Sequence, residues 1–127
     1  MIKDLKICGV SDPKTLNYIL NHHYPSKYIG FITNYEKSRR FVEYKKLKNL
    51  INVDKKQLSF VSVLVKPNNE ILEKIKDLNF DYYQLYDVEP QRTIEIKLKY
   101  KKKIITALTV SNEKDVLKYK DYYDISD

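Results

Sequence analysis

The sequence predicts an α/β protein built around a parallel β-sheet. Short runs of β-branched and aromatic residues recur roughly every 20 to 30 residues, and a stretch with helical spacing fills each gap. Consecutive parallel strands need a crossover connection, and a helix in every gap supplies one. Two architectures share this order of elements. One is a doubly wound, flavodoxin-like sheet, and the other is the first part of a (β/α)8 barrel.

Six segments are predicted as strands because they combine β-branched or aromatic residues with flanking polar or turn residues. The clearest is LSFVSVLV, an apolar run bounded on both sides by polar segments. In chain order the predicted strands cover residues 5–10, 28–33, 58–65, 82–86, 103–110 and 122–127.

The five segments between these strands carry helix signals. Ser11 or Asp12 can cap the first helix, and Pro13 suits its first turn. Asn68 is placed to cap the third helix, and Ser111 to cap the last. The predicted helices cover residues 11–23, 41–51, 68–78, 89–100 and 111–120.

Length and composition narrow the class of protein. A chain of 127 residues, 43% of them hydrophobic, is sufficient for one domain with a core. No apolar run approaches the roughly 18 residues that span a bilayer, and the first residues are too charged for a secretory signal. A single cysteine forms neither an internal disulfide nor a cysteine-based metal site. We therefore expect a cytoplasmic protein with no membrane partner and no metal.

The net charge of +7 comes mainly from lysines spread along the whole chain, because only three of the basic residues are arginines. The densest basic run, KLKYKKK at 97–103, is interpreted as a solvated helix end rather than a phosphate-contacting patch. We therefore expect no nucleic-acid partner. A positive field would still attract an anionic small molecule.

Several short strings, in order along the chain, together resemble phosphoribosylanthranilate isomerase, the (β/α)8 enzyme of tryptophan biosynthesis. The resemblance favours the barrel over the flavodoxin-like sheet and covers essentially the whole chain, but about the first three-fifths of a full barrel of this family. It implies a single incomplete barrel domain over residues 1–127, without strands 7 and 8 and their phosphate-binding loops. The strings are KICG at 6–9, GF at 30–31, KSRRF at 37–41, VSVLVKPNNEIL at 61–72, YQLYDVEP at 83–90 and ITALTVSNEKD at 105–115.

The resemblance implies a reaction and roles for named residues. The reaction is the Amadori rearrangement of N-(5-phosphoribosyl)anthranilate, a phosphorylated small molecule, and it needs no cofactor. Cys8 is expected to be the general base, and Asp127 the general acid at the end of the sixth strand, with Asp124 as its rival. Arg40 is expected to meet the anthranilate carboxylate, with Arg39 as the alternative one position earlier.

The segment around the fourth strand both matches and departs from the family. Gln84 is expected to face the pocket, whereas Tyr86 and Asp87 stand where His-Gly is usual. His22 and His23 lie at a predicted helix end and are interpreted as surface residues.

Three classes of function stay open at this point. As a free chain we expect little or no isomerase activity. The alternative is a non-catalytic, flavodoxin-like α/β binding module, which predicts helices on both faces of an open sheet. A basic nucleic-acid binder would instead show salt-sensitive retention of DNA or RNA.

Overall fold

The computed structural model describes residues 4–127 and contains one sheet of five parallel strands. Helices alternate with these strands along the chain, as the sequence predicts. The elements are β1 (Lys6–Cys8), α1 (Pro13–Leu20), β2 (Tyr28–Ile32), α2 (Tyr44–Leu50), β3 (Ser59–Val65), α3 (Asn69–Ile75), β4 (Tyr82–Tyr86), α4 (Pro90–Tyr100), β5 (Lys103–Ala107), α5 (Glu113–Val116) and the 3₁₀ helix η1 (Leu117–Tyr122).

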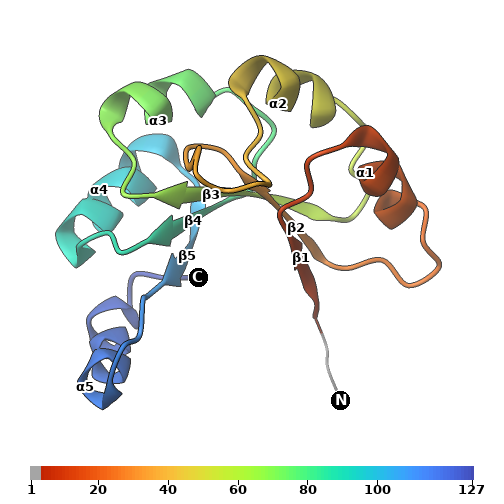
Figure 1. Ribbon diagram of the computed structural model, residues 1–127. Coiled ribbons are helices and arrows are strands. Elements are labelled where there is room, and N and C mark those ends of the chain that lie inside the picture. The colour runs from red at the N-terminus through yellow and green to blue at the C-terminus, as the bar shows by residue number, and fades with distance from the viewer. Residues whose placement is uncertain (1–3) are drawn as a thin grey trace.

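The order of the strands decides between the two architectures. The strands lie side by side in chain order, β1-β2-β3-β4-β5. Because parallel crossovers are right-handed, such an order places the connecting helices on one face of the sheet. Figure 1 shows α1, α2, α3 and α4 following one another around the same side of the curved sheet. The fold is therefore a partial (β/α)8 barrel, and the flavodoxin-like alternative, with its 2-1-3-4-5 order, is wrong.

The hydrophobic core fills the layer between the sheet and these helices. Side chains alternate along a strand, so Tyr83 and Leu85 of β4 point into this core, and their neighbours point to the opposite, inner face of the sheet. Phe31 and Phe60 meet edge to face with ring centroids 5.1 Å apart. The helices contribute fully buried apolar residues to the same layer, among them Leu16, Leu47, Leu72, Ile75 and Ile96.

Most helix starts follow the predicted capping chemistry. Of the two candidates for α1, Asp12 is the cap, and its Oδ1 accepts a hydrogen bond of 2.8 Å from the Thr15 N–H. Asn68 caps α3 through its bond to the Ile71 N–H. The prediction for the last helix is wrong by one residue, because Asn112 rather than Ser111 is the cap of α5.

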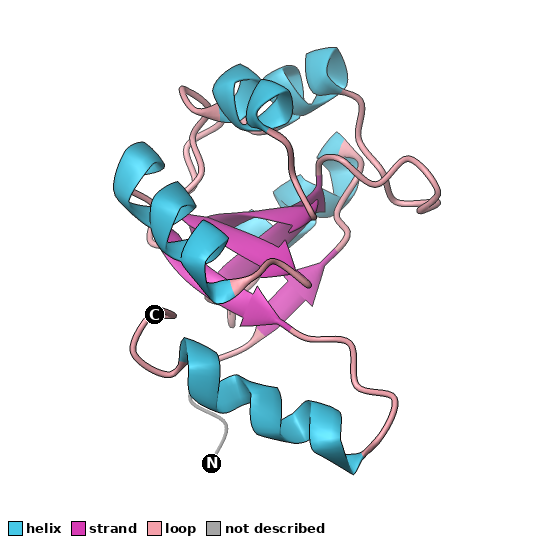
Figure 2. Cartoon of the chain, turned by 90° about the vertical axis from the view of Figure 1, so that its left-hand side faces the viewer, coloured by secondary structure: helices cyan, strands magenta, loops and turns pink. Residues whose placement is uncertain are grey.

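The predicted sixth strand is wrong. Residues 117–122 form η1, and residues 123–127 contain no strand. The cause is tertiary: Tyr122 is buried, and its hydroxyl donates a 2.7 Å hydrogen bond to the Val88 carbonyl, which fixes this turn of helix against the end of β4. Figure 2 shows α5 and η1 as a separate layer below the strands. Within the described residues, no helix is long and apolar enough to cross a membrane.

Candidate active site

The carboxyl ends of the strands surround a cavity of about 470 Å³. In barrels of this type the active site lies at this end of the sheet. The strands contribute inner-face residues, and the loops after β2, β4 and β5 contribute polar ones. The lining residues are Cys8, Ile32, Tyr35, Ser38, Arg40, Val63, Val65, Tyr86, Asp87 and Thr109.

Cys8 is the last residue of β1 and carries a free thiol that is half-buried. Its side chain lies on the inner face of the sheet, because a Cβ added at the neighbouring Gly30 would lie 3.2 Å from Cys8 Sγ. The same Cβ would lie 2.9 Å from Lys6 Nζ, so an ammonium group shares this part of the inner face. Cys8 therefore lines the cavity and is not part of the hydrophobic core.

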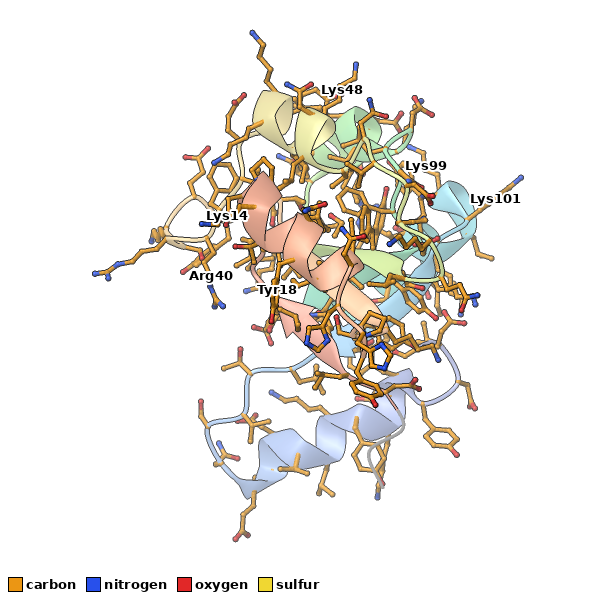
Figure 3. All side chains as sticks on the ribbon, turned by 90° about the vertical axis from the view of Figure 1, so that its right-hand side faces the viewer. Lys14, Tyr18, Arg40, Lys48, Lys99 and Lys101 are labelled. Carbon is orange, nitrogen blue, oxygen red and sulfur yellow. The ribbon has the colours of Figure 1, made fainter. Side chains whose placement is uncertain are left out.

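Arg40 comes from the loop between β2 and α2 and reaches back to β1. Its Nη1 donates a 3.1 Å hydrogen bond to the Cys8 carbonyl oxygen. The side chain is exposed to solvent and is labelled in Figure 3. The structure therefore brings together Cys8 and Arg40, two of the four predicted site residues. Arg39, the alternative, is exposed and does not line the cavity.

Three interactions fasten the loop that carries Arg40. The Asn34 side chain pairs with the backbone of Val65 at the end of β3, donating to its carbonyl and accepting from its N–H, both at 2.8 Å. The Thr33 hydroxyl donates to the Val63 carbonyl at 3.1 Å. Residues 32 and 41 form a bridge that closes the loop at its base. The bonds of Asn34 and Thr33 were not foreseen from the sequence, because their partners lie about 30 residues away along the chain.

Gln84 lies on the inner face of β4, paired with Val63 and Ile105 of the neighbouring strands. It is 9% exposed, and its Oε1 has no hydrogen-bond partner among the described residues. It does not line the cavity itself but lies two residues before Tyr86, which does. Its predicted contact with a substrate stays a prediction.

Asp87, noted in the sequence only as a departure from the family, has a defined structural role. Its backbone adopts φ 50°, a left-handed conformation that glycine, the usual family residue, takes easily. Its carboxylate accepts hydrogen bonds from the Thr109 N–H at 2.9 Å and hydroxyl at 2.7 Å. These two bonds hold the pKa of Asp87 below its ordinary value, so the carboxylate is ionised at neutral pH.

The structure does not place Asp127 opposite Cys8 at the end of a sixth strand, and its role as the general acid stays a prediction. Asp127 lies near the amino end of β5, where its N–H donates to the Ile104 carbonyl and its Oδ2 accepts from the Ile104 N–H. It also forms a salt bridge of 2.8 Å with Lys97. Partial burial acts to raise the pKa of Asp127, but its bonds to Lys97 and Ile104 outweigh burial and lower that pKa.

The remaining candidates lie away from the cavity. Asp124 does not line it, and His22 and His23 are exposed just after α1, which confirms their interpretation as surface residues. Among residues 4–127, no group of three or more His, Cys, Asp or Glu side chains is placed to hold a metal ion. A second hollow, of about 450 Å³, lies between α1 and α2 and is lined largely by apolar and amide side chains. It shares no lining residue with the cavity that Cys8 and Arg40 line.

Fold and site together define the class: a protein of the (β/α)8-barrel type whose reactive side chains lie at the carboxyl ends of its strands. The family model for N-(5'-phosphoribosyl)anthranilate isomerase matches residues 5–127. The chain belongs to this isomerase family.

Individual relatives agree with this assignment. The chain is 32% identical over 129 aligned residues to the N-(5'-phosphoribosyl)anthranilate isomerase of Agrobacterium fabrum, covering 100% of this chain and 57% of that protein. The solved enzyme from Thermotoga maritima has a similar fold, with a TM-score of 0.78 at 23% identity, covering 98% of this chain and 59% of that one. A phosphoribosyl anthranilate isomerase in complex with reduced 1-(o-carboxyphenylamino)-1-deoxyribulose 5-phosphate gives a TM-score of 0.79, with 23% identity and coverage of 98% and 62%. The chain thus spans a little over half the length of these relatives.

Proposed function

We propose that this chain carries the part of a phosphoribosylanthranilate isomerase active site that holds the general base and the carboxylate-binding arginine. The observation that carries the proposal is the hydrogen bond between Arg40 and the Cys8 carbonyl, at the mouth of the cavity, in a chain of this family. The substrate class is a phosphorylated small molecule, and a solved family member binds a reduced product analogue of that kind.

The Amadori rearrangement needs an acid to protonate the ribose ring oxygen and a base to remove the proton from C2. In this proposal Cys8, as the thiolate, is the base. Arg40 pairs with the anthranilate carboxylate through the bidentate geometry that guanidinium and carboxylate groups share. Gln84 supports the bound substrate from the inner face of β4.

The general acid is not supplied by the carboxyl groups of the described cavity lining. Among residues 4–127, Asp87 is the one carboxyl group that lines it, and its carboxylate is ionised and engaged by Thr109. We therefore propose that the acid, the phosphate-binding loops and the strands that close the barrel come from additional polypeptide. This polypeptide would be either the remainder of a longer chain or a separate partner.

The same proposal places the protein in the cytoplasm. A free thiol that works as a base must stay reduced, and the cytoplasm is the compartment that keeps thiols reduced.

A chimera tests the proposal. Residues 1–127 are joined to the part of the Agrobacterium fabrum isomerase that lies beyond its match to this chain. Cooperative unfolding of the chimera shows first that it has folded. The proposal predicts isomerase turnover that Cys8→Ser lowers by about 10²- to 10⁴-fold, the usual contribution of a general base.

The arginines provide the matched control in the same chimera. Arg40→Ala is expected to raise KM and to weaken inhibition by anthranilate, whereas Arg39→Ala leaves both unchanged. Turnover that survives Cys8→Ser in a folded chimera contradicts the assignment of the base.

A further inference from the structure

The chain turns sharply at Gly9, directly after Cys8. Gly9 has φ 83°, a left-handed conformation that side chains strain. The N–H groups of Gly9 and Val10 both donate to the Gly30 carbonyl oxygen, at 2.9 and 3.1 Å. These two hydrogen bonds to one carbonyl oxygen fix the backbone at the end of β1.

The Arg40 side chain lies directly over this turn. A Cβ added at Gly9 would lie 2.6 Å from Arg40 Cδ, 2.8 Å from Nε and 2.9 Å from Cζ. Such separations are too short for any real carbon contact, so the two side chains cannot occupy this space together. The Cδ, Nε and Cζ atoms of Arg40 thus occupy the space that a Cβ would take at residue 9.

Two contacts therefore hold a long, exposed side chain in one place. The first is the van der Waals contact with Gly9, and the second is the hydrogen bond from Arg40 Nη1 to the Cys8 carbonyl. An unrestrained arginine has a large rotamer entropy, which binding would have to overcome. Among the described residues, no carboxylate forms a salt bridge with Arg40, so its charge stays available for an external anion.

We propose that Gly9 is a positioning residue for Arg40: its missing side chain seats the arginine so that the guanidinium is pre-organised, at the cavity that Cys8 also lines, to receive a carboxylate. The identity of that carboxylate, the anthranilate group, rests on the proposed function. The seating of Arg40 by Gly9 rests on the geometry alone.

The charge beside Cys8 can be measured in the 127-residue chain without any turnover. The thiol is alkylated with iodoacetate, which is anionic, and in parallel with iodoacetamide, which is neutral. A change in the thiolate fraction affects both rates equally and cancels in their ratio. A fixed cation near Cys8 raises the ratio by about fivefold, the attraction between unit charges a few ångströms apart in water.

The proposal predicts that Arg40→Ala lowers this ratio about fivefold and that Gly9→Ala lowers it to a similar extent. In the Arg40→Ala background, Gly9→Ala produces no further change. Arg39→Ala, the neighbouring control, leaves the ratio as in the unmodified chain. Gly9→Asn adds a Cβ with a residue that tolerates positive φ, and it gives the same loss in a variant whose backbone is less strained.

Two results would overturn the proposal. One is an unchanged ratio in Gly9→Ala or Gly9→Asn while Arg40→Ala lowers it. The other is the absence, in the unmodified chain, of nuclear Overhauser contacts between the Gly9 α protons and the Arg40 δ protons, which needs no variant to fold. If the isomerase proposal alone is wrong, the folded chimera has no isomerase activity, whereas the ratios of the iodoacetate and iodoacetamide rates in the 127-residue chain still follow the predicted pattern.

Discussion

The Asn34 side chain is the strongest single link between the site loop and the sheet, and its removal should be measurable as lost stability. Asn34→Ala deletes two hydrogen bonds, each 2.8 Å long, to the N–H and carbonyl of Val65. A buried or half-buried hydrogen bond contributes about 1 kcal/mol net, and an N–H or carbonyl left unpaired costs more. The expected loss in the free energy of unfolding is therefore about 2 kcal/mol.

Urea unfolding at 25 °C, followed by circular dichroism, measures this loss. With a typical slope of about 2 kcal/mol per molar urea, the midpoint falls by about 1 M. Asn52→Ala is the matched control, because Asn52 is exposed, and its expected effect is below about 0.5 kcal/mol. A loss below about 0.5 kcal/mol in Asn34→Ala would refute the argument that Asn34 fastens the loop carrying Arg40.

Three further predictions concern a buried hydroxyl, a strained residue and an exposed ion pair. The Tyr83 hydroxyl is buried without a partner among the described residues, so Tyr83→Phe should leave the unfolding free energy unchanged or raise it by about 1 kcal/mol in urea titrations; a clear fall would contradict this. Asp87→Ala and Asp87→Gly both lose the bonds to Thr109, but only glycine relieves φ 50°, so the glycine variant should be the more stable by about 1 kcal/mol in the same titration. Lys99, with Lys76 and Tyr100, lowers the pKa of Glu73 from 4.5 to about 2. The contribution of ionised Glu73 to the free energy of unfolding is therefore complete above pH 4.5 and disappears as the pH falls toward 2. The stability difference between the unmodified chain and Glu73→Gln should therefore shrink across that interval, and a constant difference would contradict the shift.

Local sequence patterns predicted the elements that depend on local chemistry. The strands β1 to β5 and the helices α1 to α4 lie where alternating apolar runs, caps and prolines placed them. Strand order could not be obtained in this way, because crossover direction and neighbour pairing are properties of the whole sheet. The resemblance to a known family favoured the barrel, and the observed order confirmed it.

The errors cluster at the end of the chain, where tertiary contacts override local preference. The segment YYDISD has the composition of a strand, yet Tyr122 is held by the distant Val88 carbonyl and Asp127 by Lys97. The candidate site could likewise be predicted only in part from the sequence. Cys8 and Arg40 were selected from short strings, whereas the fit of Arg40 over Gly9 appears only when residues 31 positions apart meet in space.

The rate of the isomerase reaction with the 127-residue chain alone tests the central claim most directly. The account holds that this chain places a base and a carboxylate-binding arginine at the carboxyl ends of its strands and that no carboxyl group lining the described cavity can act as the acid. It predicts no turnover above the uncatalysed rate, although Cys8 and Arg40 are in place. Substantial turnover by the chain alone that Cys8→Ser abolishes would contradict the account, because it would show that these residues already contain a working acid.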